Sequence, residues 1–306
     1  MSFLWLQVVA PTVISTFCGT GGSSLGYKWA GFKELLAVDF ESHAVECFRM
    51  NFPEVPVWHK SVTDITGQQI MDFCGIKPGE LDVFDGSPPC QGFSTAGKRI
   101  VSDSRNDLFQ HYVRLTHELQ PKVFVMENVT GMAKGKMRGK FIEIMQTLKG
   151  LNYRVKCKQM NSKYYNVPQS RERLIFIGVR KDLERGPVYP IASKKLIPIR
   201  DIIPDIDGHH RGQFDKKIKG VGSVAYTLTK TPSMKFIRKG EECTPTKVEL
   251  LRLCSFPEEW KMKGTGSGTT ALACKKNGFR HIGIEQTEEH YDIATKRIEH
   301  DQTNRV

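Results

Sequence analysis

The chain has 306 residues and a composition that is ordinary for a globular protein, so one large domain or a core with an inserted lobe is expected. Its formal net charge of +12 favours a polyanionic partner such as nucleic acid. The eight cysteines form no C-x-x-C pair, and no apolar run is long enough to span a bilayer, which argues against a disulfide framework, a zinc site and a membrane anchor.

The first predicted strand, 13–17, runs directly into a glycine-rich turn at 18–26 and a short helix that ends at Gly31. A second strand, 35–39, ends on the carboxylate of Asp39. Glycines at such a turn let a ligand approach the backbone, and an acid at the end of the next strand can hold ribose hydroxyls. The pattern favours a nucleotide-like cofactor, although a purely structural turn is the alternative. Phe40 would either cover an adenine ring or pack in the core.

A third predicted strand, 81–84, leads into the loop Gly-Ser-Pro-Pro-Cys-Gln-Gly-Phe-Ser at 86–94. Two prolines stiffen the backbone before Cys90, and Gly92 allows a sharp turn after it. A free cysteine is usually a small buried hydrophobe, but a core position does not call for these neighbours. The loop is therefore predicted to present Cys90 as a thiolate nucleophile.

Further along, helices are predicted near 44–50, 108–119 and 141–148, and strands at 123–126 and 174–179. Strands that alternate with helices predict an α/β fold with a mainly parallel sheet covered on both faces. Ligands bind at the carboxyl ends of such strands. The glycine turn, Asp39, Cys90 and Glu127 all fall at these ends.

Between 181 and 245 the periodic pattern breaks down, and lysine, glycine and proline become frequent. His209 and His210 are expected in a loop, because adjacent side chains point apart and do not suit one metal ion. A basic, loop-rich lobe suits phosphate contacts, and a solvated linker is the alternative.

In this order, the motifs resemble those of the DNA cytosine-5 methyltransferases, from about Val13 to Trp260. The matching segments are the methyl-donor loop Phe17-Cys18-Gly19-Thr20-Gly21-Gly22, the nucleophile loop Pro88-Pro89-Cys90-Gln91, Glu127-Asn128-Val129, Gln169-Ser170-Arg171-Glu172-Arg173, and Thr246 to Trp260. The resemblance implies a Rossmann-like S-adenosylmethionine-dependent methyltransferase sheet with a small target recognition lobe. It divides the chain into a catalytic core at 1–180, a target recognition region at 181–245 and a C-terminal segment at 246–306.

The resemblance also implies the chemistry: transfer of a methyl group from S-adenosylmethionine to carbon 5 of cytosine in duplex DNA. Cys90 would form a covalent adduct with a base flipped out of the helix, and Glu127 would lie against its N3 and exocyclic amine. Arg173 would hold the cytosine oxygen or the Cys90 loop, and Asn128 would brace the proline loop. The implied catalytic residues are Cys90, Gln91, Glu127, Asn128, Arg171 and Arg173, with Gln169 in support. The implied donor-binding residues are Phe17, Gly19, Gly21, Gly22, Asp39, Phe40, Asp64 and Pro88, and no metal is expected.

One donor contact stays open at this point. Asp64-Ile65 matches the family's Asp-hydrophobic pair, whereas Ser61-Val62 lies closer to the expected spacing. In the second alignment a serine replaces the acid that would face the adenine.

The resemblance stops near Lys263. The tail from Gly264 resembles the Gly-Ser-Gly-Thr-Thr segment of amino-methylating DNA methyltransferases, but it lacks their Asp-Pro-Phe and is not expected to form a second donor site. The alternatives are an RNA cytosine-5 methyltransferase and a DNA-binding protein without turnover. If the chain is a DNA cytosine-5 methyltransferase, we expect a monomeric, cytoplasmic enzyme of the bacterial or phage restriction-modification type.

Overall fold

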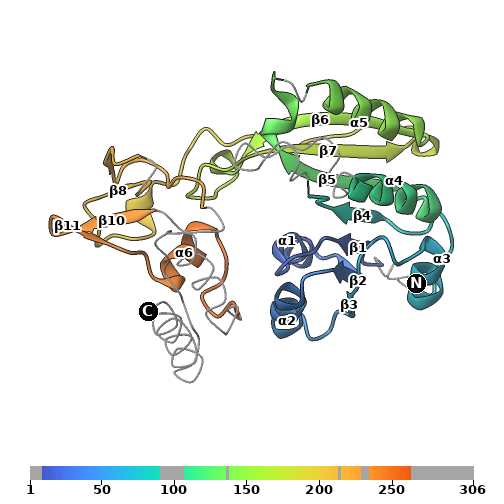
Figure 1. Ribbon diagram of the computed structural model, residues 1–306, viewed down its shortest axis with the longest axis horizontal. Helices are drawn as coiled ribbons and strands as arrows, with labels where there is room; N and C mark the ends of the chain where they lie inside the picture. Colours follow the sequence, from blue (N-terminus) through green and yellow to red (C-terminus); the bar gives the residue numbers. More distant parts are fainter. Residues whose placement is uncertain (1–8, 90–106, 136–137, 213–214, 229–233, 263–306) are drawn as a thin grey trace, which may run out of the picture.

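The computed structural model describes residues 9–89, 107–135, 138–212, 215–228 and 234–262. These residues form a seven-stranded sheet flanked by helices and a separate four-stranded sheet (Figure 1). Within these ranges no helix combines the length and apolar character that a membrane span requires.

The large sheet has the strand order β3-β2-β1-β4-β5-β7-β6. Its strands are β1 (Thr12–Thr16), β2 (Lys33–Asp39), β3 (Val57–His59), β4 (Val83–Gly86), β5 (Val123–Val129), β6 (Tyr153–Asn161) and β7 (Glu172–Arg180). The neighbours from β3 to β5 are parallel, whereas β7 is antiparallel to both β5 and β6. The predicted α/β class and mainly parallel sheet are thus confirmed, and the antiparallel edge formed by β7 and β6 is the part that the sequence did not predict.

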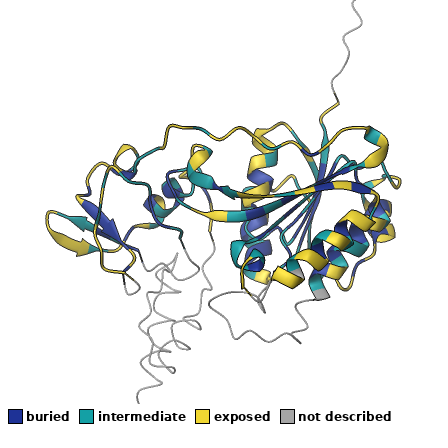
Figure 2. Cartoon of the chain, turned by 90° about the horizontal axis from the view of Figure 1, so that it is seen from above, coloured by how far each residue is buried: buried dark blue, intermediate teal, exposed yellow. Residues whose placement is uncertain are grey.

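Helices cover both faces of the large sheet. They are α1 (Gly22–Trp29), α2 (Ser42–Asn51), α3 (Gly67–Cys74), α4 (Asp107–Leu119) and α5 (Arg138–Gly150), with the 3-10 turns η3 (Thr130–Ala133) and η5 (Ser162–Tyr164). One hydrophobic cluster joins α3, α4 and α5 to the sheet, and another joins α1 and α2. Figure 2 shows the resulting pattern, in which the strands are mostly buried and the outer faces of the helices are exposed.

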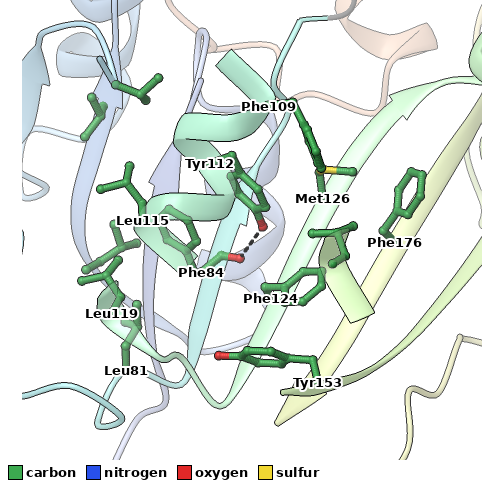
Figure 3. Close-up of a cluster of buried hydrophobic side chains, with 14 of the residues drawn as sticks. Leu81, Phe84, Phe109, Tyr112, Leu115, Leu119, Phe124, Met126, Tyr153 and Phe176 are labelled. Atoms are coloured by element: carbon green, nitrogen blue, oxygen red, sulfur yellow. Dashed lines mark hydrogen bonds between the residues drawn. The ribbon is translucent and has the colours of Figure 1, made fainter. Parts of the chain in front are cut away.

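The larger cluster contains Tyr112 of α4, which is fully buried between that helix and the sheet (Figure 3). Its ring stacks on Phe84 at 5.0 Å between centroids, and its hydroxyl lies 3.0 Å from the carbonyl of Val125 and 3.3 Å from that of Phe84. Since burying an unpartnered hydroxyl is unfavourable, these carbonyls allow an aromatic ring of this size to fill the centre. The packing fixes β4 and β5 side by side, and the Cys90 loop and Glu127 follow from their ends.

The lobe between 199 and 245 contains a four-stranded sheet of order β11-β10-β8-β9. Its strands are β8 (Gly208–His210), β9 (Lys219–Gly220), β10 (Lys235–Arg238) and β11 (Glu241–Cys243). The prediction that His209 and His210 lie in a loop is therefore wrong: both are buried on β8, where strand alternation separates their side chains. Most of the lobe's described residues lie outside helices and strands, as predicted, and they enclose a small core of isoleucines with Phe236.

Helix α6 (Lys247–Leu253) links the lobe to the core. It begins with a capping box in which Thr246 accepts from the Glu249 amide and the Glu249 carboxylate accepts from the Thr246 amide. Leu251 belongs to the cluster of α1 and α2, whereas Leu253 belongs to the lobe's core. The helix therefore packs against both.

Candidate active site

The glycine turn after β1 holds a backbone that few residues other than glycine adopt. Gly19 and Gly21 have φ values of +56° and +94°, and Phe17 has +54°. An added Cβ at Gly21 would lie 2.3 Å from the ring of Phe52. The Gly19 amide donates to Asp39 Oδ2 at 2.8 Å, so the turn and the end of β2 are held together at the same edge.

The other oxygen of Asp39, Oδ1, accepts from the Glu41 amide at 2.9 Å. Each carboxylate oxygen has a second lone pair, which remains available for a ribose hydroxyl. The ring of Phe40, the next residue, is 69% exposed and so can cover a purine. In the described part of the chain, helix α1 has no side-chain cap and no acid in its first turn. Its first amides and the positive end of its dipole therefore suit a carboxylate.

The structure places Ser61 and Asp64 in one turn after β3. Ser61 follows the strand end by two residues and is partly buried, and its hydroxyl lies 2.8 Å from that of Thr63. Asp64 is exposed and accepts from the Thr63 hydroxyl at 2.7 Å. Of the two, Ser61 is nearer in sequence to the end of β3, and neither is assigned to the adenine.

Two hydrogen bonds fix the start of the proline loop. The Ser87 hydroxyl donates to the carbonyl of Phe17 at 3.3 Å, and the Asn128 amide donates to the carbonyl of Pro88 at 3.2 Å. The second is the contact predicted for Asn128, and the first is one that sequence reasoning missed. Together they join the glycine turn, the proline loop and the end of β5. Cys90 and Gln91 themselves lie outside the described residues.

At the end of β5, Glu127 forms an ion pair with Arg173 of β7, with 2.5 Å between Oε1 and Nε. The two side chains are 35% and 22% exposed, so the pair is partly shielded from water yet open to a ligand. Arg173 Nη1 also donates to the carbonyl of Glu172 at 2.8 Å. These contacts orient the carboxylate beside the loop that Asn128 holds.

The other residues of the Gln-x-Arg-x-Arg motif lie on the turn between β6 and β7. Gln169 is buried, and its amide lies 3.3 Å from the Cys254 sulfur. Arg171 is exposed, and its backbone amide donates to the hydroxyl of Ser162 at 3.1 Å. In this structure Gln169 supports the turn. Among the described residues Glu127 forms its ion pair with Arg173, and Arg171 interacts with Glu127 only through longer-range electrostatics.

Four of the six described cysteines are poor candidates for the nucleophile. Burial raises the pKa of the thiols of Cys18, Cys74, Cys157 and Cys254, with Cys74 reaching about 11 and Cys157 about 12. Such thiols carry almost no thiolate near neutral pH. The described residues also contain no group of three or more metal-ligating side chains.

A cavity of about 590 Å³ opens beside Arg173. The lobe contributes Arg211, Lys219 and Tyr226 to its wall, and the catalytic sheet contributes Arg173 and Glu172. The sequence pattern gave no individual role to Arg211, Lys219 or Tyr226. Arg211 directly follows β8, which pairs with β9 at Lys219, and Tyr226 is brought beside them by the hydrogen bonds of its two neighbours in the chain to residues 168–170.

Comparison with known proteins adds an independent line of information. Residues 11–231 match the C-5 cytosine-specific DNA methylase family. The chain is 41% identical over 198 residues to the type II methyltransferase M.XorII of Xanthomonas oryzae, covering 64% of this chain and 46% of that protein. It is 43% identical over 177 residues to M1.HphI of Haemophilus parahaemolyticus, covering 56% and 46%. The chain thus spans about half the length of these curated relatives.

Among solved structures, the fold is similar to that of a protein described as a DNA modification methyltransferase encoded within an Escherichia coli prophage. The TM-score is 0.55 at 31% identity, over 69% of this chain and 61% of the other. The DNMT2 of Spodoptera frugiperda has a TM-score of 0.50 at 24% identity, over 63% and 59%, which supports the likeness of fold alone.

Proposed function

The chain belongs to the C-5 cytosine-specific DNA methylase family, and from this membership we propose that it transfers a methyl group from S-adenosylmethionine to carbon 5 of cytosine in duplex DNA. The observation that carries the proposal is the Glu127–Arg173 ion pair, which lies next to the proline loop held by Asn128. Arg173 lines the cavity, so the carboxylate with which it pairs lies close to the space that a base would enter.

The described residues fit the cofactor. The glycine turn would approach its backbone closely, Asp39 would bind the ribose hydroxyls and Phe40 would cover the adenine. The open amides at the start of α1 would bind the methionine carboxylate. Bound S-adenosylmethionine supplies an electrophilic methyl group on its sulfonium.

The residues of the chain supply the rest of the chemistry. The Cys90 thiolate forms a bond to carbon 6 of a flipped cytosine, which makes carbon 5 nucleophilic. Glu127 lies against N3 and the exocyclic amine and stabilises the charge that develops there. Arg173 keeps Glu127 in place. After methylation, a base or water removes the carbon 5 proton, the bond to sulfur breaks and the thiolate leaves.

The test is transfer from labelled S-adenosylmethionine to duplex DNA, followed by bisulfite sequencing to locate modified cytosines. Cys90→Ser should bind DNA but transfer nothing, because a hydroxyl is not appreciably ionised near neutral pH. A duplex with 5-fluorocytosine at the target should stay covalently attached to the native protein, since the fluorine cannot leave as a proton does. Absence of transfer to any cytosine, with normal DNA binding, would identify a binding protein instead. Preferred labelling of transfer RNA in a competition assay would identify an RNA enzyme.

We also propose that residues 181–245 read the DNA target and that the protein acts as a monomer. The first proposal is supported by the lobe's position beside Arg173 and by its basic side chains. Light scattering with and without a DNA duplex would test the second, and a dimer in both states would overturn it.

The tail from Gly264 lies outside both the family match and the described residues. We propose that it does not form a second donor site. Titration with S-adenosylmethionine should give one site per chain, lost in Asp39→Ala and retained in Glu285→Ala. Two sites, or loss of binding in Glu285→Ala alone, would place a donor pocket in the tail.

A further inference from the structure

The cavity beside Arg173 is lined by charged and aromatic side chains from two parts of the fold. Tyr226 of the lobe is buried, and its ring holds two cations: the Arg211 guanidinium carbon lies 4.5 Å from the ring centroid and the Lys219 Nζ lies 4.0 Å from it. Both distances are within the range of a cation–π interaction. The ring therefore acts as a support for the cations, and is not free to stack on a base.

The cations are not neutralised within the described part of the chain. Neither Arg211 nor Lys219 forms an ion pair with a described residue. Arg173, the third cation on the cavity wall, is already paired with Glu127. Burial and the neighbouring cations Arg211 and Lys163 lower the pKa of Lys219, while Asp215 opposes this effect. The one carboxylate on the cavity wall belongs to Glu172. Such an excess of positive charge favours an anion, and a phosphate group suits a guanidinium and an ammonium together.

The fold fixes these cations relative to the catalytic residues. On either side of Tyr226, the Ala225 amide donates to the carbonyl of Pro168 at 2.9 Å, and the Thr227 hydroxyl donates to that of Ser170. The Ser170 amide also donates back to the carbonyl of Ala225 at 2.9 Å. Tyr226 is thus tied to the turn that leads directly into β7 and Arg173.

We propose that Arg211 and Lys219, supported by Tyr226, bind a backbone phosphate of the target DNA strand and thereby position the flipped base beside Glu127. This inference rests on the proposed function. The two cations are positioning residues, since they act on the phosphate and not on the reacting atoms. DNA phosphodiester and free inorganic phosphate share the required chemistry, and the test separates them.

The test measures the affinity of the full-length protein for a DNA duplex by fluorescence anisotropy, without cofactor, between about 50 and 200 mM salt. Arg211→Gln and Lys219→Gln should each reduce the slope of log K against log salt by about one, which corresponds to roughly eightfold weaker binding at 0.1 M salt. Tyr226→Leu should act like the loss of both cations, whereas Tyr226→Phe should bind as the native protein does. Arg211→Lys should retain most of the native slope of log K against log salt, because it keeps the positive charge.

Lys217→Gln is the matched control, because Lys217 is an exposed lysine of the same lobe that does not line the cavity. Equal slopes for the native protein, Arg211→Gln and Lys219→Gln would overturn the proposal. The proposal would also be overturned if inorganic phosphate competed as strongly as DNA does. A slope change seen with RNA but not with DNA would overturn it as well. Because binding is read without methyl transfer, a changed slope in an inactive protein refutes only the proposed function. An unchanged slope in an active protein refutes only the phosphate site.

Discussion

At the scale of single residues, the Glu127 carboxylate has two roles that a neutral amide cannot fill. Its charge both holds Arg173 at 2.5 Å and faces the proposed base. Glu127→Gln should lower methyl transfer by roughly 100- to 1,000-fold, because stabilisation of developing charge is lost. Binding of S-adenosylmethionine should not change. Single-turnover rates with saturating DNA would measure the effect.

Glu184→Gln is the control for this variant, since Glu184 is an exposed glutamate beyond the opposite end of β7. It should retain the native rate. A Glu127→Gln protein that is as active as the control would show that another group stabilises the cytosine.

At the scale of elements, the contact between α1 and β4 contains a carboxyl that is poorly suited to ionisation. Burial raises the pKa of Asp85 to about 7, although Ser23 and Tyr27 hydrogen bonds oppose the shift; Glu34 and Glu127 add to it. A carboxyl with a raised folded-state pKa contributes stability that is complete below pH 4 and is lost as pH rises through about 7. Asp85→Asn should therefore raise the free energy of unfolding at pH 8 by on the order of 1–3 kcal/mol. At pH 4 it should have little effect.

Asp82, just before the same strand, provides a contrast of opposite sign. Despite its burial, hydrogen bonds from Lys122 and Thr12 lower the pKa of Asp82. Its stabilisation is present above the ordinary carboxyl pKa and is lost as pH falls through the lowered value. Asp82→Asn should thus destabilise at pH 8. Urea unfolding of both variants at pH 4 and 8 would check the opposite signs at pH 8 and the small effect of Asp85→Asn at pH 4. Parallel shifts of the two variants at pH 8 would contradict the assignment.

The turn between β1 and α1 makes a separate prediction. Gly21→Ala should destabilise the fold by about 1–3 kcal/mol, because its φ is +94° and its Cβ would meet the Phe52 ring. It should also weaken S-adenosylmethionine binding, as measured by calorimetry. Gly26→Ala is the matched change within α1, where a Cβ meets nothing within 4 Å. It should be neutral or stabilising, so equal losses in the two variants would refute the steric explanation.

At the scale of the whole molecule, the segment after α6 closes the core. Trp260 packs edge-on against Phe52 at 5.6 Å and against Phe256 at 4.9 Å between ring centroids. The side chain of Asn51 both donates to the carbonyl of Lys261 and accepts from its amide. Trp260→Ala should lower the free energy of unfolding by about 3–5 kcal/mol. Met262→Ala, at an exposed position of the same segment, should change it by less than about 1 kcal/mol.

Much of the large sheet and of the candidate site could be predicted from the sequence. The buried strands are easily recognised, and the candidate site residues lie at or near their carboxyl ends. The glycine turn, Asp39 and Glu127 lie at one edge of the sheet for that reason. Strand β6 was missed although Tyr153, Val155 and Cys157 alternate with cations, a pattern of period two. The lobe could not be predicted in the same way, since strands of two to four residues carry no measurable period.

The antiparallel direction of β7 also determines how the lobe is attached. The chain leaves β7 at the edge away from Glu127 and must return across the sheet, where the Tyr189 hydroxyl lies 2.8 Å from the carbonyls of Lys156 and Ile175 (Figure 1). The return distance is the length of a nine-residue strand, about 30 Å, whereas residues 181–198 could extend over about 60 Å. The connection formed by residues 181–198 is therefore longer than the distance that it has to cover, and it does not by itself fix the position of the lobe. Loop lengths in 181–198 can vary without moving the cations beside Tyr226, as long as the hydrogen bonds between 168–170 and 225–227 persist.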